Sequence, residues 1–246
     1  MRIRILFLFT IFSVLSFAQE KVQDSITRKK ITAVKLEKAP KIDGNLDDDA
    51  WKNIPIAKDF IEFRPNNGKA EDADFKSEVK IAYDDTGIYV SAMLYDKEPS
   101  KISKELTERD NIGNDDFFVL FLNGYNDKQQ SLELFVTAAG VQADSKITNE
   151  NGEDFSWNGI WYSAAKIVEN GWTVEMKIPF SELRFPKTEA QNWGLNFFRQ
   201  INRTKTAYTW NYINNQKGGF LLYDGVLENI KNIDPPIRLS FMPYFS

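Results

Sequence analysis

The sequence contains neither cysteine nor histidine among its 246 residues. Disulfide bonds, haem ligation and zinc sites built from these residues are therefore excluded, and so are Ser-His-Asp and Cys-His nucleophilic sites. An enzyme of this composition would have to use carboxylate, lysine, tyrosine, serine or threonine chemistry. An excess of positive charge is also missing, because 31 basic residues stand against 35 acidic ones. The resulting net charge of −4 argues against a nucleic-acid partner.

The longest hydrophobic run lies at the N-terminus. Two arginines precede an apolar stretch over residues 5–17, and the small residues Ser16 and Ala18 stand at the −3 and −1 positions of a cleavage site. This stretch is shorter than the roughly 20 residues that a membrane-spanning helix needs. We therefore predict a signal peptide at residues 1–18 and export of the remaining chain.

Residues 19–30 are polar and carry charges of both signs, which predicts a disordered leader. The chain that follows consists of short apolar runs separated by turn residues, a pattern typical of an all-β protein. Asn170-Gly171 and the acidic turn at residues 84–87 each separate two such runs and predict hairpins. Residues 117–122 are apolar at every position, as expected for a central strand covered on both faces.

The same pattern predicts the remaining elements. Further strands are expected at residues 132–137, 141–147, 193–202 and 220–227. Short helices are expected only at residues 47–53 and 181–183. We therefore predict an all-β fold over residues 31–230, an antiparallel β-sandwich of the jelly-roll type with few short helices.

Five sequence blocks occur in an order that resembles a known family. They are residues 41–47 with Ala50-Trp51, 79–85 with 88–90, 115–122, 171–180, and 193–197 with Arg199 and Arg203. Together they resemble the family 9 carbohydrate-binding module, in the variant found ahead of outer-membrane β-barrels of unknown function in Bacteroidota. The resemblance implies a β-sandwich over residues 31–230 and an oligosaccharide or cell-envelope glycan as partner. It also implies an outer-membrane-associated location and, in some members, a structural calcium ion.

The positions that clamp the sugar in this family differ here. The resemblance places Ile112 where sugar-binding members have a tryptophan, and Phe118 where they have a glutamate that points at the sugar. A second tryptophan of those members corresponds to Lys217-Gly218. Aromatic stacking supplies much of the affinity for sugars, and a missing polar partner costs about 1–3 kcal/mol more. We therefore predict that the family's sugar site is degenerate in this chain.

Other aromatic residues could take over the role of the clamp. Trp157 and Trp161 flank Asn158 at the end of a polar loop, where they could form an exposed stacking platform. Packing of the indole rings in the core is the alternative. Trp157, Asn158 and Trp161 are accordingly the candidate ligand-binding residues.

An acidic cluster precedes the expected central strand. Asp110, Asn114, Asp115 and Asp116 supply oxygen atoms of the kind that calcium prefers. They are the candidate ligands of a structural calcium ion, the only cofactor that the sequence suggests. The alternative is that all four are solvated turn residues.

Alternation along residues 193–203 places Arg199 on the same face as three large apolar side chains. If that face belongs to the core, the guanidinium needs a carboxylate partner, and Asp115, Asp116 and Glu175 are the candidates. Alternatively, the twist of the strand brings Arg199 to the rim of the sheet. The first alternative predicts a structural ion pair rather than a catalytic one.

The last residues of the sequence differ in pattern from the rest. A linker with two prolines is followed by alternating apolar and polar residues and by Tyr244 and Phe245. This pattern predicts that residues 231–246 are a linker and the first strand of a membrane barrel that continues in a longer parent chain. An additional edge strand of the sandwich is the alternative.

The sequence thus indicates a non-catalytic, carbohydrate-binding-like domain of a secreted or outer-membrane protein. A first alternative is an accessory or catalytic part of a polysaccharide-degrading glycoside hydrolase, which would need two carboxylates about 5–9 Å apart across a cleft. A second alternative is a structural or interaction domain of an outer-membrane barrel.

Overall fold

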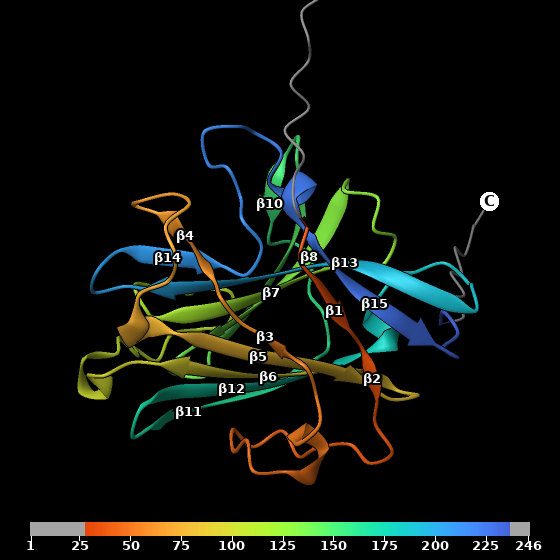
Figure 1. Ribbon diagram of the computed structural model, residues 1–246, viewed down its shortest axis with the longest axis horizontal. Coiled ribbons are helices and arrows are strands. Elements are labelled where there is room, and N and C mark those ends of the chain that lie inside the picture. Colours follow the sequence, from red (N-terminus) through yellow and green to blue (C-terminus); the bar gives the residue numbers. More distant parts are fainter. Residues whose placement is uncertain (1–27, 237–246) are drawn as a thin grey trace, which may run out of the picture.

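Two β-sheets face one another across the hydrophobic core (Figure 1). The computed structural model describes residues 28–236. The larger sheet has the order β1 (Lys30–Thr32), β15 (Gly225–Lys231), β13 (Ala190–Ile201), β7 (Phe117–Asn123), β8 (Gln130–Thr137), β9 (Gln142–Thr148) and β10 (Gly152–Asp154), with β14 (Thr206–Thr209) beside β13 and β4 (Ile61–Arg64) beside β14. The smaller sheet has the order β11 (Tyr162–Val168), β12 (Gly171–Pro179), β6 (Gly87–Tyr95), β5 (Ser77–Tyr83) and β2 (Val34–Lys35), with β3 (Ile56–Ala57) also paired to β5.

Helical structure in residues 28–236 is limited to short 3-10 turns. These are η1 (Asp49–Trp51), η2 (Ala73–Phe75), η3 (Pro99–Lys101), η4 (Phe180–Glu182) and η5 (Phe220–Tyr223). The helix expected at 47–53 therefore shrinks to η1, and the helix expected at 181–183 corresponds to η4, which begins one residue earlier. Among the described residues, no helix has the length and apolar character to cross a membrane.

The expected all-β sandwich is confirmed, and local sequence signals explain its hairpins. The turn at residues 84–87 joins β5 to β6, and Asn170-Gly171 joins β11 to β12. Gly171 has a φ of 146°, and a Cβ atom there would lie 2.1 Å from the Leu94 main-chain oxygen. Only glycine fits this close approach of β12 to β6. Strand β7 is central, as expected, and is covered on both faces.

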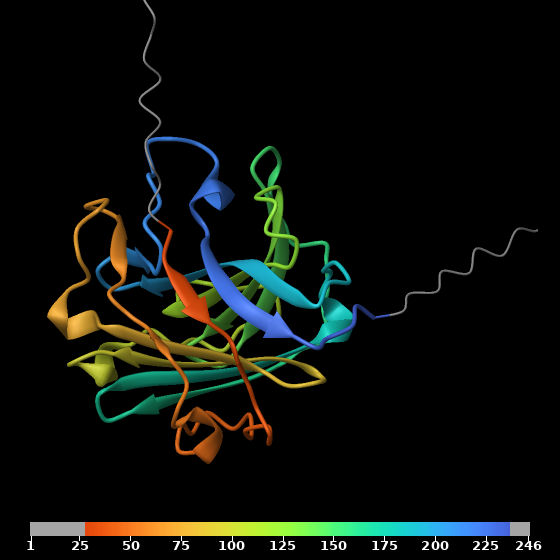
Figure 2. The same cartoon turned by 45° about the vertical axis from the view of Figure 1, so that its right-hand side comes forward.

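The sheets are mixed rather than purely antiparallel. β1 pairs in parallel with β15, and β2 pairs in parallel with β5. Figure 2 shows β1 and β15 side by side although they lie at opposite ends of the described chain. Residues 30–35 therefore pass from the larger sheet to the smaller one. The other strand pairs of the described chain are antiparallel, as expected. The two parallel pairs were not foreseen because hairpin signals detect only neighbours joined by a short turn.

Two boundaries also differ from expectation. The strand expected at residues 220–227 begins later, since η5 occupies its first half and β15 starts at Gly225. Residues 28–30 were expected in the disordered leader, but they bond to the sandwich and Lys30 starts β1. The predicted signal peptide (1–18), the rest of the leader (19–27) and the expected barrel strand (237–246) lie outside the described residues.

Candidate binding site

A hollow of about 730 Å³ lies at one end of the larger sheet. Its walls come from the end of β7 and the loop after it, from the start of β8, from the end of β9 and from the segment that follows η4. Trp193 and Leu132 are among its apolar residues. Trp157 completes the wall, and we refer to this site as the Trp157 hollow.

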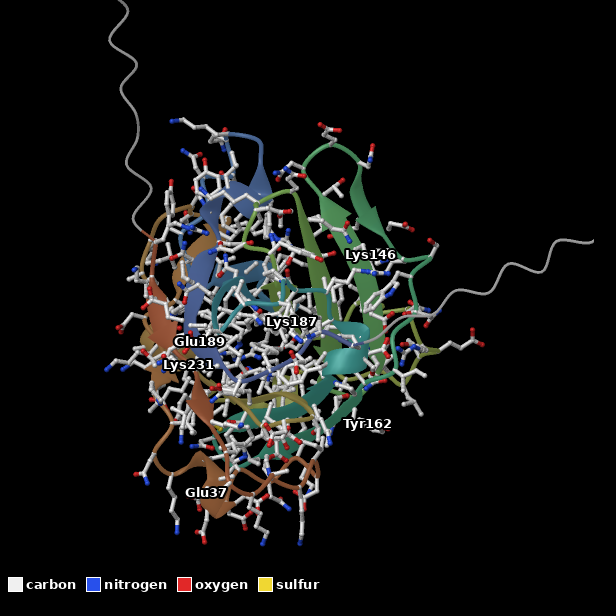
Figure 3. The ribbon with its side chains drawn as sticks, turned by 90° about the vertical axis from the view of Figure 1, so that its right-hand side faces the viewer. Glu37, Lys146, Tyr162, Lys187, Glu189 and Lys231 are labelled. Atoms are coloured by element: carbon white, nitrogen blue, oxygen red, sulfur yellow. The ribbon has the colours of Figure 1, made fainter. Side chains whose placement is uncertain are left out.

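Trp157 is half-buried and packs against the core. Its ring folds back over Gly159, where a Cβ atom would lie 2.7 Å from the indole. Lys146 of β9 lines the same hollow, with Nζ 5.5 Å from the centroid of the Trp157 ring, and Figure 3 shows this lysine on the strand that borders the hollow. The indole thus combines an apolar surface with a nearby cation.

Amide side chains supply most of the neutral polar groups of the Trp157 hollow. Gln129, Gln130 and Asn151 have no hydrogen bond from their side chains to the rest of the described chain, so that they can bond to a ligand. The charged lining residues are Lys128, Lys146, Arg184, Asp127, Glu150 and Glu182. These are three cations and three anions, so the formal charges cancel. The lining therefore suits an uncharged ligand rich in hydroxyl groups.

Tyr125 was not identified from the sequence, although it belongs to the same hollow. Its side chain is 55% exposed in the loop after β7. Asn123 holds this loop, since its Oδ1 accepts hydrogen bonds from the main-chain N–H groups of Tyr125 and Asn126, each at 3.1 Å. The only feature of the sequence that could have identified Tyr125 is its position as a lone aromatic residue in a polar turn.

Trp161 is not part of an exposed platform with Trp157. It is 5% exposed, and its Nε1 donates to Asp144 Oδ2 at 2.8 Å. Asp144 also accepts a hydrogen bond from the Gly159 N–H at 3.1 Å and pairs with Arg109. The third candidate, Asn158, is exposed and accepts a hydrogen bond from Arg109 Nε at 3.2 Å. Asp144 therefore fixes the segment that carries all three candidates.

A second, shallower hollow of about 820 Å³ lies beside this segment. Leu106, Gln142, Trp161, Tyr162 and Lys177 are among its lining residues. We refer to it as the Tyr162 hollow; Figure 3 shows Tyr162 on the same side of the molecule as Lys146.

The candidate calcium ligands do not converge. Asp110 accepts from the Asp144 N–H at 3.2 Å, Asp115 from the Glu105 N–H at 2.7 Å, and Asp116 from the Asn202 N–H at 2.9 Å. Asn114 is exposed. Within residues 28–236, no three acidic side chains form a group that could hold a metal ion. The carboxylates cap main-chain donors of separate segments instead, as turn residues do.

Arg199 is completely buried, as the core alternative required, but its expected ion pair is absent. Its guanidinium donates to the main-chain oxygens of Phe75 at 2.7 Å, Lys76 at 3.0 Å and Tyr95 at 2.7 Å. Main-chain oxygens thus replace Asp115 and Asp116, whose own bonds are described above. Glu175, the third expected partner, accepts hydrogen bonds from Trp51 Nε1 at 2.8 Å and from the N–H groups of residues 43 and 44.

Two of the three positions that the resemblance assigns to the sugar clamp hold packing residues. Phe118 is fully buried and stacks on Phe197, with 5.8 Å between ring centroids. Ile112 packs against the apolar cluster on the outer face of the larger sheet. Lys217 and Gly218 lie exposed in the loop before η5.

Comparison with known proteins places the chain in a family. Residues 42–217 match the family described as Carbohydrate family 9 binding domain-like, and the chain belongs to this family. It is thus a carbohydrate-binding module-like domain. No curated protein matches the chain.

Solved structures are similar in fold. One is a family 9 carbohydrate-binding module from Caldicellulosiruptor kristjanssonii in complex with cellotriose, with 17% identity and a TM-score of 0.52 over 89% of this chain and 100% of that one. The match to a family 9 module of that organism in complex with glucose has 17% identity and a TM-score of 0.54, over 86% and 99% of the two chains. A candidate carbohydrate-binding protein from Bacteroides uniformis ATCC 8492 has 12% identity and a TM-score of 0.64, over 85% and 100%.

Proposed function

We propose that this domain binds an uncharged oligosaccharide in the Trp157 hollow and does not cleave it. The observation that carries the proposal is that the half-buried Trp157 lines the same hollow as side-chain amides that make no hydrogen bond within the described chain. A sugar ring can place its apolar face on the indole while its hydroxyl groups bond to Gln129 and Gln130. The site would replace the family's clamp, which is degenerate on this proposal.

The absence of catalysis is supported by the position of the perturbed carboxyl groups. A glycoside hydrolase needs a general acid whose pKa is raised. Burial raises the pKa of Glu133 to about 8 and those of Glu71 and Asp224 to about 7. None of these three side chains lines the Trp157 hollow. We therefore favour a binding module over the glycoside hydrolase alternative.

We further propose that the protein is exported and associated with the outer membrane through a barrel in the same parent chain. The apolar N-terminal stretch with its cleavage signal and the alternating residues after the proline linker support this proposal. The glycan would then be an external oligosaccharide or part of the cell envelope.

A glycan array probed with the purified protein tests the binding proposal. We expect binding to at least one neutral oligosaccharide, and a loss of about tenfold in affinity for both Trp157→Ala and Tyr125→Ala, as expected for one lost stacking contact. Tyr125 is exposed, so its replacement should leave the fold intact. Tyr212→Ala, which removes an exposed aromatic residue outside the hollow, is the matched control.

Two results would overturn the proposal. If no oligosaccharide binds, or if both variants bind as well as the control, the Trp157 hollow is not a sugar site. If the purified protein hydrolyses a bound oligosaccharide, the domain is catalytic.

A further inference from the structure

The two hollows lie along the same strand. Gln142 of β9 lines the Tyr162 hollow, and Lys146 of β9 lines the Trp157 hollow. Alternate residues of a strand share one side, so both side chains leave β9 in the same direction. Four residues of extended chain separate them by about 13 Å. Strand β9 therefore borders both hollows, and the Tyr162 hollow extends from it onto β11 and β12 of the smaller sheet.

A short bridge separates the hollows at Asp144, midway between Gln142 and Lys146. The Asp144 carboxylate accepts the Gly159 N–H and the Trp161 indole N–H, at 3.1 and 2.8 Å, and pairs with Arg109. Residues 157–161 therefore cross β9 at a fixed position. Trp157 stands at one end of this bridge, and Tyr162 follows its other end.

The top of the bridge presents a polar group to solvent. Asn158 is exposed, and its Oδ1 is held by Arg109. Its Nδ2 donates no hydrogen bond to the part of the chain that the structure describes. This amide can therefore donate to a ligand that passes from one hollow to the other.

The Tyr162 hollow offers a second aromatic surface. Tyr162 is 54% exposed, and Leu106 on the border of the same hollow is 86% exposed. Lys177 stands opposite Tyr162 on β12 and lines the same hollow, with its Nζ 5.5 Å from the centroid of the Tyr89 ring. An exposed aromatic ring next to polar side chains is suited to stacking on a sugar.

We propose that the Tyr162 hollow is a second subsite for the ligand of the Trp157 hollow. The ligand is then a linear polysaccharide chain that lies across the bridge at Asn158, and a monosaccharide fills only one subsite. This inference rests on the proposed function, because it assumes that the Trp157 hollow binds sugar. Linking two contacts in one ligand raises the affinity without any change in either contact.

Oligosaccharide length provides the test. The probes are ladders of one to six units of β-1,4-linked glucose, xylose and mannose, titrated into the purified protein. We expect the affinity to rise at least about fivefold between three and six units on one ladder. Tyr162→Ala should remove this rise and leave the affinity for three units unchanged. Asn158→Ala should reduce the rise in part, and Tyr212→Ala, as matched control, should retain it.

The outcomes separate this inference from the proposed function. If the affinity stops rising at three units, or if the rise survives in Tyr162→Ala, the proposal of a second subsite is wrong. An affinity that depends on Trp157 would still support the first proposal, that the Trp157 hollow binds sugar. If no ladder binds, or if binding is independent of Trp157, both proposals fail for these ligands.

Discussion

Arg203 and Asp96 form a bidentate ion pair that joins the two sheets. The distances are 2.6 Å between Nη1 and Oδ2 and 2.7 Å between Nη2 and Oδ1. Asp96 follows β6 of the smaller sheet, and Arg203 follows β13 of the larger one. The Asp96 side chain is fully buried, so the guanidinium is the counter-charge that makes its burial tolerable.

The first prediction concerns the loss of this pair. Arg203→Met leaves the Asp96 carboxylate buried and unpaired, which should lower the free energy of unfolding by about 3 kcal/mol. Chemical denaturation at neutral pH measures this loss. Lys187→Ala is the control, because Lys187 pairs with Asp234 on the surface and its removal should change little. Equal effects of the two substitutions would contradict the structural role of Arg203.

The same pair predicts a pH dependence. Burial acts to raise the pKa of Asp96, but the hydrogen bonds from Arg203 and from the Glu98 N–H prevail and hold it below its usual value. The stabilisation is therefore present above the pKa of the unfolded chain and is lost as the pH falls through the lowered folded value. Below about pH 4 the wild type should lose stability faster than Arg203→Met. Parallel curves for the two proteins would contradict this prediction.

The next prediction concerns Arg199, which lies in β13 four residues before Arg203. Arg199→Lys keeps the charge, but a single ammonium cannot reach the main-chain oxygens of Phe75, Lys76 and Tyr95 together. An unpaired buried acceptor costs about 1–3 kcal/mol, so we expect a loss on the order of 3 kcal/mol and a Tm lower by roughly 6–12 °C. Arg184→Lys at an exposed position should leave the Tm unchanged. A wild-type Tm for Arg199→Lys would show that these bonds contribute little.

Local signals in the sequence were sufficient for the hairpins and for the central strand. Turn residues and alternation act over a few positions, so the β5–β6 and β11–β12 hairpins were recognised without knowledge of the rest. The parallel pairing of β1 with β15 joins segments almost 200 residues apart, as the Lys30–Val226 register shows. Such pairing leaves no local pattern.

The candidate site could be predicted only in part for a related reason. Trp157 was identified because a tryptophan in a polar loop is conspicuous, but its neighbour Lys146 is an ordinary strand residue. Trp161, just before β11, is buried and donates to Asp144, whereas Tyr162, the first residue of β11, is exposed. No local pattern in the sequence shows which of these two neighbours faces solvent. Of the two alternatives left open for Arg199, burial in the core is the correct one, but no sequence pattern reveals main-chain oxygens as partners.

Glu133 provides the fourth stability prediction. It is buried on β8, where burial raises its pKa to about 8 and the hydrogen bond from Ser145 only partly opposes this effect. The folded protein therefore holds a proton that the unfolded chain releases at lower pH. The stability contributed by this carboxyl is fully present below the unfolded pKa and is lost as the pH rises towards 8.

Glu133→Gln should remove this dependence. Between pH 5 and pH 8 we expect the variant to lose less stability than the wild type, by up to about 1.4 kcal/mol for each pH unit. Urea denaturation across this range measures the difference. Glu189→Gln, at an exposed position shown in Figure 3, should follow the wild type. If Glu133→Gln does so as well, Glu133 is ionised in the folded protein.

The last prediction concerns the start of the fold, where Arg28 reaches the buried Asp224. Arg28 donates to the Asp224 main-chain oxygen and to Asn126 Oδ1, and the Val226 N–H donates to the Lys29 main-chain oxygen at 2.9 Å. Arg28→Ala removes two hydrogen bonds and the nearby positive charge. We therefore expect a loss of about 1–3 kcal/mol in the free energy of unfolding and faster hydrogen exchange at Val226.

Burial raises the pKa of Asp224 to about 7 against the opposing charges of Arg28 and Lys128. Without Arg28 this pKa should rise further, so the destabilisation caused by Arg28→Ala should be larger at pH 8 than at pH 5. Asp224→Asn in the Arg28→Ala background should abolish that difference between the two pH values. Unchanged exchange at Val226 in Arg28→Ala would show that Arg28 does not hold β1 on β15.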